Sequence, residues 1–239
     1  MKQGMQVRVG RATREGTGGA LADAAATYRS ASTGRTAVAV VDGMGHGPDV
    51  VRLAPLLAET AVRVGAVRGG LAGLLSAGLL LADPGPPDAV GVLAVTRADG
   101  SGAELVWAGD CRAYRWDGDT GLEQLTTDHN LAAYLNRAAR DAGDVPVTAL
   151  ADFVGVTLGT AVPATVPYVS VPAGGLLLLT TDGVHDQVKA QVLERLAREH
   201  VDDPQLLADA LVAAASPDTA GCRDDATALV LALRPLVES

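Results

Sequence analysis

The stretch TAVAVVDGMGHGPDVV, residues 36–51, decides how the rest of the chain is interpreted. Its first six residues are small or β-branched, which predicts a buried strand over Thr36–Val41. The strand ends at Asp42, three glycines fall in the next five positions, and Pro48 then suits the first turn of a helix over Pro48–Val67. A carboxylate therefore stands at the end of an apolar strand, beside a loop that allows close approach to the backbone.

The same alternation of strand-like and helix-like runs continues along the chain. Further strands are predicted at Ala89–Arg97, Ala103–Trp107, Arg112–Trp116, Val166–Val171, Leu176–Thr180 and Ala226–Leu233, and further helices at Leu131–Asp141, Ala190–His200 and Pro204–Ala215. Asp-Gly pairs in RADGSGA and RWDGDTG indicate hairpins, so neighbouring strands are expected to be antiparallel. Helix pairs between the strand runs favour an α+β fold, with antiparallel sheets covered by helices.

Composition favours one enzyme-sized domain over residues 1–239, because 48% of the residues are hydrophobic and only 20% are charged. The net charge of −9 comes without a basic tract, so neither nucleic acid nor an anionic membrane is an expected partner. The start of the sequence lacks an apolar leader, and the apolar run at Leu71–Ala82 is too short to span a bilayer. We therefore expect a cytoplasmic protein in which Cys111 and Cys222 are reduced.

Acids recur at the ends of the predicted strands. Asp42 follows AVAVV, Asp110 follows ELVWAG, Asp182 follows LLLLTT, and the pair Asp224–Asp225 precedes ATALVLAL. If these ends meet, two carboxylates ~4 Å apart repel by roughly 4 kcal/mol at an effective dielectric of about 20. Such a cluster must take up protons or hold cations, and hard oxygen ligands favour Mg²⁺ or Mn²⁺. The chemistry indicated is metal-assisted hydrolysis.

Two other interpretations of these segments remain open at this point. Any one of the acids, taken alone, is more often a turn residue than a ligand. The matching forms VVDGMG and TTDGVH favour a shared site instead. A dinucleotide-binding glycine loop would require glycine at position 48, where this chain has Pro48, and a Walker loop would require Gly-Lys-Ser/Thr.

In order along the chain, VVDGMGHG, WAGDCRAYRWDGDTGLEQLTTDHNLAAYL, VTLGT, AGGLLLLTTDGVHDQV and CRDDATALVLAL resemble the motifs of one family. It is the PPM family, the metal-dependent protein serine/threonine phosphatases of type 2C, in its bacterial form. The resemblance implies a four-layer α-β-β-α sandwich, with two antiparallel sheets flanked by helix pairs. It also implies hydrolysis of phosphoserine and phosphothreonine in a protein substrate by a metal-bridged water, with two or three Mn²⁺ or Mg²⁺ ions, in a pathway with a serine/threonine kinase.

The resemblance also assigns roles to individual residues. Asp42 resembles the acid that bridges two metals, and Gly43 the residue whose carbonyl binds the second. Asp182 and Asp224 resemble the remaining ligands of the first metal. Asp110 resembles the acid that, with Asp182, holds the third metal of bacterial members.

The chain departs from the family pattern mainly in the first motif. Gly18 stands where a phosphate-binding Arg is expected and Ala22 where a Glu is expected, and only the final acid is kept, as Asp23. Loss of the Arg removes a bidentate phosphate contact. Met44 replaces a catalytic histidine of eukaryotic members, and His46 is a candidate general acid in the same loop.

Expected roles can also be given for three further residues and one segment. Cys111 replaces a serine, a small-for-small change, and His129 is expected to be a structural helix-entry residue. Asp225 replaces the usual Asn and is expected to orient Asp224 or a metal-bound water. A flap beside the site is sought in DAGDVPVTALADFVG, residues 141–155.

Three functions compete on these grounds. An active phosphoprotein phosphatase is favoured because the metal ligands are retained. A catalytically weak or inactive pseudophosphatase, acting as a regulatory binding module, is the alternative that Gly18 and Ala22 suggest. A phosphatase of a small phosphorylated metabolite is the third.

Overall fold

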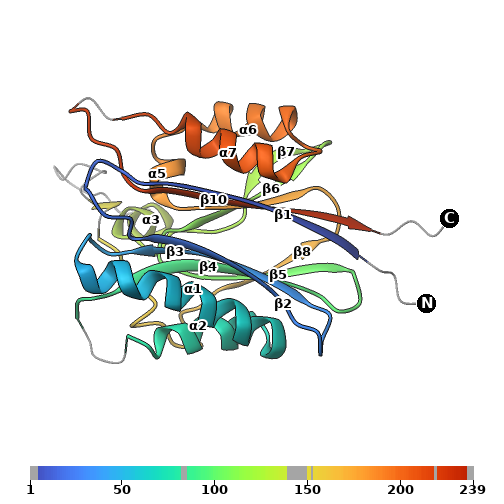
Figure 1. Cartoon of the computed structure of the whole chain (residues 1–239), viewed down its shortest axis with the longest axis horizontal. Coiled ribbons are helices and arrows are strands. Elements are labelled where there is room, and N and C mark those ends of the chain that lie inside the picture. The colour runs from blue at the N-terminus through green and yellow to red at the C-terminus, as the bar shows by residue number, and fades with distance from the viewer. Residues whose placement is uncertain (1–4, 82–84, 139–149, 152, 218–219, 236–239) are drawn as a thin grey trace.

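The structure is a computed structural model that describes residues 5–81, 85–138, 150–151, 153–217 and 220–235. Within these residues the strands form two five-stranded antiparallel sheets, in the orders β1-β10-β9-β6-β7 and β2-β3-β4-β5-β8 (Figure 1). The first contains β1 (Met5–Arg14), β10 (Ala226–Pro235), β9 (Leu176–Thr180), β6 (Arg112–Asp117) and β7 (Gly121–Gln124). The second contains β2 (Asp23–Arg29), β3 (Thr36–Gly43), β4 (Ala89–Thr96), β5 (Gly102–Ala108) and β8 (Tyr168–Pro172).

Helices cover the outer face of each sheet, which gives the four layers seen in Figure 1. Helices α1 (Pro48–Arg68) and α2 (Gly70–Gly78) pack on β2–β5, while α6 (Ala190–Glu199) and α7 (Pro204–Ala214) lie over the other sheet. The short helices α3 (Leu131–Arg137) and α5 (Asp182–His185) lie toward one end of the sandwich. The expected α-β-β-α sandwich is confirmed.

Three apolar clusters hold the layers together. One fills the space between the two sheets, one lies under α1 and α2, and one lies under α6 and α7. Strand β4 is buried on both faces, which explains its unbroken apolar sequence AVGVLAVT. Each fully buried Val or Leu contributes about 1.5–3 kcal/mol to folding. The sheet ends that carry the acids are therefore fixed by the core.

The predicted strands and helices are present, with boundaries shifted by one or two residues. The helix expected over Leu131–Asp141 is described as far as Arg137, and its last part lies outside the described residues. Most of the flap sought at 141–155 also lies outside them. The sequence analysis missed β1, β2, β7, α5 and the helical nature of α2.

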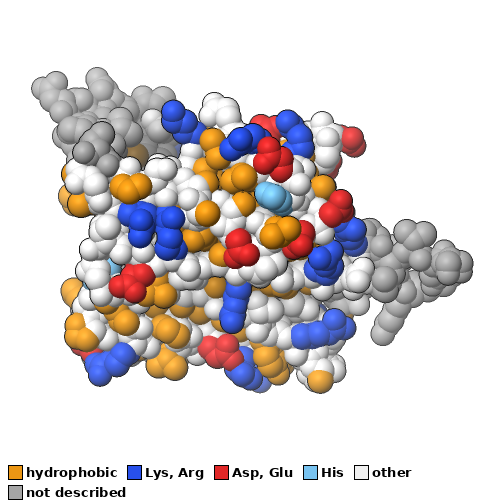
Figure 2. Space-filling view, turned by 45° about the horizontal axis from the view of Figure 1, so that its top comes forward, with side chains coloured by type: hydrophobic (Ala, Val, Ile, Leu, Met, Phe, Trp, Pro, Cys, Tyr) orange, Lys and Arg blue, Asp and Glu red, His pale blue; other side chains and the backbone are white. Residues whose placement is uncertain are grey.

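Two features of the described surface bear on the expected partners. No helix in the described part of the chain is long and apolar enough to cross a membrane. On the face shown in Figure 2, Lys and Arg side chains are interspersed with Asp and Glu side chains rather than gathered into one patch.

Candidate active site

Sheet pairing brings the strand-end acids to one end of the sandwich. Asp23 lies directly opposite Asp42 in the β2–β3 ladder. Asp182 follows β9 and Asp224 precedes β10, and these two strands are antiparallel neighbours. Asp110 lies between β5 and β6, where the chain passes from one sheet to the other. With the exception of Asp23, these acids line a single pocket of about 450 Å³.

Two glycines let the acid-bearing turns pack closely against their neighbours. A Cβ at Gly43 would lie 2.2 Å from Val50 Cγ1 and 2.9 Å from the carbonyl oxygen of Ala22. Gly109 has φ +98°, and a Cβ there would lie 2.2 Å from Val90 Cβ. Side chains at either position would push Asp42 or Asp110 away from the pocket.

Burial raises the pKa of the acids at this end of the sandwich, and neighbouring negative charges add to the shift. Burial, followed by the negative charges of Asp182 and Asp23, raises the pKa of Asp42 well above its ordinary value. Burial, followed by Asp224 and Asp110, raises the pKa of Asp182 to about 7. Burial raises the pKa of Asp23 to about 7, although the hydrogen bond from Thr181 Oγ1 at 2.8 Å opposes the shift. Burial likewise raises the pKa of Asp110 to about 6. These carboxyl groups therefore lack enough positive charge around them.

The donor set fits a hard divalent cation. Carboxylate oxygens predominate near Asp42, and Mg²⁺ and Mn²⁺ are the ions that such oxygens prefer. Among the described residues, no three His, Cys, Asp or Glu side chains are already arranged to hold a metal ion. A cation would have to draw the side chains together, and it would relieve the repulsion from neighbouring carboxylates that contributes to the raised pKa values of Asp42 and Asp182.

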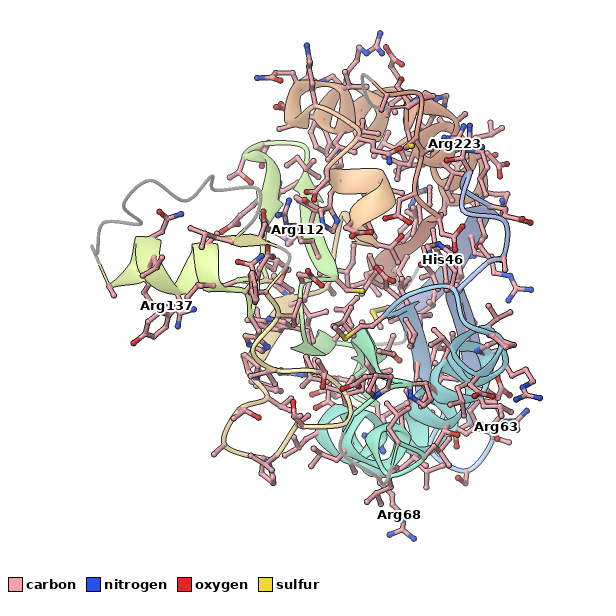
Figure 3. All side chains as sticks on the ribbon, turned by 90° about the vertical axis from the view of Figure 1, so that its left-hand side faces the viewer. His46, Arg63, Arg68, Arg112, Arg137 and Arg223 are labelled. Carbon is pink, nitrogen blue, oxygen red and sulfur yellow. The ribbon has the colours of Figure 1, made fainter. Side chains whose placement is uncertain are left out.

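Two positively charged or polar groups face the pocket from opposite sides. Arg112 makes bidentate hydrogen bonds to Asp128, the shortest at 2.7 Å, and its Nη1 lies 3.5 Å from Asp186 Oδ1. Figure 3, which looks onto this end of the molecule, shows Arg112 on one side and His46 on the other. Arg112 is therefore held by acids on its own side of the pocket.

His46 lies at the pocket rim, and 39% of its side chain is exposed. Its Nε2 is 3.9 Å from Asp224 Oδ1 and 3.8 Å from Asp225 Oδ2. A Cβ at Gly18 would lie only 3.1 Å from this Nε2, so the ring lies over Gly18. The imidazole thus covers the position at which the resemblance places an arginine.

Asp225 holds the loop that carries Gly18. Its two carboxylate oxygens accept hydrogen bonds from the backbone N–H groups of Gly16 and Ala22, both at 2.7 Å. The backbone N–H of Asp225 donates to Asp224 Oδ1 at 2.8 Å. The main chain of Asp225 thus contacts Asp224, and the Asp225 side chain fixes the loop of residues 16–22. The sequence analysis did not predict this role of the side chain.

Replacing Asp225 with Asn is expected to destabilise the protein by about 1.5–3 kcal/mol, because one charge-assisted hydrogen bond is lost. The asparagine amide would also point its own N–H₂ at a backbone N–H. Urea unfolding of Asp225→Asn measures the loss. Asp209→Asn, at an exposed position on α7, is the matched control. Equal stability of the two variants would show that the Asp225 contacts do not hold the loop.

Several pocket residues were missed by sequence reasoning. They are Arg112, Asp128, Asn130, His185 and Asp186. His185 Nδ1 is 2.9 Å from Thr180 Oγ1, and burial, followed by the charge of Arg112, lowers its pKa well below the ordinary value. The available signal was its position one helical turn after Asp182.

His129 contacts the turn that carries Asp110. Its ring stacks on Trp107 with centroids 6.2 Å apart, and its Nδ1 accepts a hydrogen bond from Gly109 N at 3.2 Å. Its backbone N–H donates to the carbonyl of Gly109 at 3.0 Å. These contacts support the structural role expected for His129. Cys111, next to Asp110, is buried between the sheets.

The chain folds as an α-β-β-α sandwich with an acid-lined pocket at one end, and the same fold is found in bacterial PPM serine/threonine phosphatases. No family profile and no curated protein matches the sequence. Among solved structures, the chain is similar to the PPM Ser-Thr phosphatase MsPP from Mycobacterium smegmatis in complex with cacodylate. The two are 23% identical with a TM-score of 0.73, over 95% of this chain and 98% of MsPP.

Two other solved structures have the same fold. Serine/threonine phosphatase Stp1 from Staphylococcus aureus is 17% identical with a TM-score of 0.75, over 100% of this chain and 98% of Stp1. The catalytic domain of the serine/threonine protein phosphatase PstP in complex with 2 manganese ions is 18% identical with a TM-score of 0.69. That match covers 97% of this chain and 100% of the PstP domain. These similarities establish the fold, and the activity has to be argued from the site.

Proposed function

We propose that this protein is a PPM-type phosphatase that hydrolyses phosphoserine and phosphothreonine in a protein substrate with Mn²⁺ or Mg²⁺. The observation that carries the proposal is the convergence of Asp42, Asp110, Asp182 and Asp224 in one pocket at the end of a PPM-like sandwich. The raised pKa values of Asp42, Asp110 and Asp182 indicate a site that favours positive charge. The manganese ions in the PstP structure support the choice of metal.

The proposed role of each group comes from the resemblance to the PPM motifs. Asp42, Asp182 and Asp224 would hold cations together with the carbonyl of Gly43, and Asp110 with Asp182 would hold a further one. Divalent cations there would neutralise the phosphate charge and activate water for attack on phosphorus. Asp23 lies opposite Asp42 on the neighbouring strand, and the hydrogen bond from Thr181 Oγ1 fixes the Asp23 carboxylate. His46 Nε2 gives a proton to the leaving serine or threonine oxygen.

The test is turnover of p-nitrophenyl phosphate and of a phosphothreonine peptide with Mn²⁺. We expect turnover that disappears with EDTA and in Asp182→Asn. Asp209→Asn makes the same change in net charge at a residue of α7 that does not line the pocket, and this variant should retain the turnover. Activity that survives both EDTA and Asp182→Asn would rule out the metal mechanism.

His46→Gln is expected to lower kcat for the phosphothreonine peptide by about 10²-fold, because the alkoxide leaving group needs a proton. With p-nitrophenyl phosphate, whose leaving group is stable as an anion, kcat should change little. His200→Gln is the control, since His200 does not line the pocket. An equal loss on both substrates would assign His46 to binding rather than to proton transfer.

A pseudophosphatase is the second candidate, and the covered position of Gly18 favours it. The first-motif Arg and Glu are replaced by Gly18 and Ala22, and His46 fills the space above Gly18. This candidate predicts phosphopeptide binding without turnover at any metal concentration. Clear Mn²⁺-dependent turnover would exclude it.

We also propose that the protein acts in the cytoplasm, on proteins phosphorylated by a serine/threonine kinase. A serine/threonine kinase is proposed because a phosphoserine or phosphothreonine substrate requires an enzyme that phosphorylates it. Cell fractionation tests the first point, and comparison of phosphoproteomes with and without the gene tests the second.

A further inference from the structure

A second hollow, of about 520 Å³, lies beside the acid-lined pocket. We call it the α3 groove, and it is lined mainly by His129, Leu131, Tyr134, Arg137, Phe153 and Val156. Two large aromatic side chains are exposed beside this hollow, with 56% of Tyr134 and 66% of Phe153 accessible. Two accessible aromatic rings around one hollow are typical of a binding surface.

The walls of the α3 groove are held together by backbone contacts. Leu131 N donates to the carbonyl of Phe153 at 3.0 Å, and Gly155 N donates to the carbonyl of His129 at 2.7 Å. The Asn130 side chain caps α3 by accepting from Ala133 N at 2.9 Å. The two segments that carry Tyr134 and Phe153 are thus fixed relative to each other.

The α3 groove is continuous with the acid-lined pocket. Asp128, Asn130 and Val154 line both hollows. His129, on the floor of the groove, is hydrogen-bonded to Gly109 beside Asp110. A peptide chain whose phosphate enters the pocket can therefore place neighbouring residues in the groove. Figure 3 shows α3 with Arg137 beside the Arg112 side of the site.

We propose that the α3 groove binds the part of the phosphoprotein substrate next to the phosphorylated residue, through a large apolar side chain and a carboxylate. The inference rests on the phosphatase function proposed above. Tyr134 and Phe153 contact the apolar side chain, and Arg137 pairs with the carboxylate. Asp128 does not compete for Arg137, because it already holds Arg112 in bidentate hydrogen bonds. A hollow of about 520 Å³ lies within the ~300–1,000 Å³ typical of ligand pockets, a size that suits a few side chains of a substrate.

The apolar part is tested with two phosphothreonine peptides that differ only in carrying Phe or Gly near the phosphothreonine, and with p-nitrophenyl phosphate. Phe153→Ala and Tyr134→Ala are expected to raise KM for the Phe peptide about 5- to 30-fold, with kcat unchanged. KM for the Gly peptide and for p-nitrophenyl phosphate should not change. Leu79→Ala is the matched control, because Leu79 is 75% exposed but does not line the groove.

The charged part is tested by a charge exchange. Arg137→Glu should raise KM for a peptide with Asp beside the apolar residue and lower it for the same peptide with Lys. Fluorescence anisotropy of the labelled Phe peptide with Asp182→Asn, with and without Phe153→Ala, measures binding without turnover. Weaker binding in the double variant supports the groove even if the wild-type protein turns over no substrate.

Failure of the groove and failure of the proposed function give different results. Wild-type protein that hydrolyses neither peptide nor p-nitrophenyl phosphate contradicts the phosphatase function. Normal hydrolysis and binding with no effect of Phe153→Ala, Tyr134→Ala and Arg137→Glu overturns the groove proposal. A groove variant that changes the oligomeric state in light scattering, without changing KM or peptide binding, would assign the groove to a second copy and also overturn it.

Discussion

Replacing Asp42 with Asn is expected to lower metal-dependent turnover by about 10³-fold, equivalent to about 4 kcal/mol of transition-state stabilisation. Asp42 has the largest expected effect because burial, followed by the negative charges of Asp182, Asp23, Asp110 and Asp224, raises its pKa well above the ordinary value. An amide keeps the shape of the side chain but removes the charge that attracts a divalent cation. The measurement is the Mn²⁺ dependence of kcat for p-nitrophenyl phosphate.

The same substitution is expected to stabilise the metal-free protein by about 1–3 kcal/mol, because a buried carboxylate among other carboxylates is replaced by a neutral group. Thermal unfolding in EDTA measures this effect. Activity and stability thus change in opposite directions, which a general folding defect would not produce.

The control for Asp42→Asn is Asp209→Asn, which should alter neither turnover nor the unfolding temperature appreciably. If Asp42→Asn destabilises the metal-free protein, the carboxylate contributes favourable contacts. The electrostatic interpretation of the acid cluster is then wrong. If it retains wild-type turnover, the proposed bridging role of Asp42 fails.

The acids could be predicted from sequence because each one ends or begins an apolar run. Four leucines and two β-branched threonines precede Asp182, and β9 is a central strand with neighbours on both sides. An apolar run followed by an acid and glycine needs no knowledge of long-range contacts. The same local pattern predicted the start of β3 and the start of α1 correctly, although β3 extends two residues beyond the predicted end at Val41.

The missed strands β1, β2 and β7 are all edge strands of their sheets, where local signals are weak. In β1, MQVRVGRATR, charged and polar residues outnumber apolar ones, and the strand pairs only with β10. In β2, DAAATYR, alanine favours helix by intrinsic propensity, but the ladder with β3 determines a strand. Long-range pairing overrides local preference at both edges.

The site contacts that sequence could not predict join distant segments. His46 lies over Gly18, and Asp225 binds the backbone of Gly16 and Ala22 across the molecule. Sequence comparison with the PPM motifs shows only that an Arg and a Glu are missing. The structure adds that the loop around Gly18 is fixed by a carboxylate, an arrangement that no spacing pattern encodes.

The metal-free protein is expected to lose about 1–3 kcal/mol of stability as the pH rises from 6.5 to 8.5. Folding raises the pKa of Asp23 and Asp182 to about 7, whereas an unfolded Asp titrates near 3.8. Between these values the folded state binds more protons than the unfolded state. Stability therefore falls as the pH rises through the folded-state pKa values.

The buried histidine acts in the opposite direction at lower pH. Folding lowers the pKa of His185, because the buried imidazole resists protonation. Its contribution to the free energy of unfolding is therefore fully present above about pH 6.5 and is lost as the pH falls below that value. Asp110, with a pKa raised to about 6, titrates in the same lower range. The window from 6.5 to 8.5 therefore isolates Asp23, Asp182 and Asp42 from the histidine.

Mn²⁺ should reverse this dependence, because cations bind the deprotonated carboxylates and stabilise the folded state more as protons leave. Thermal unfolding at pH 6.5 and 8.5, in EDTA and in excess Mn²⁺, gives the four values needed. We expect the increase in Tm on adding Mn²⁺ to be larger at pH 8.5, by about 2–4 °C for each 1 kcal/mol.

In Asp42→Asn both the pH dependence of stability and the increase in Tm on adding Mn²⁺ should be smaller. A metal-free protein whose stability is constant or rises across this window would show that the strand-end carboxylates do not repel one another, and the cation site would lose its physical basis.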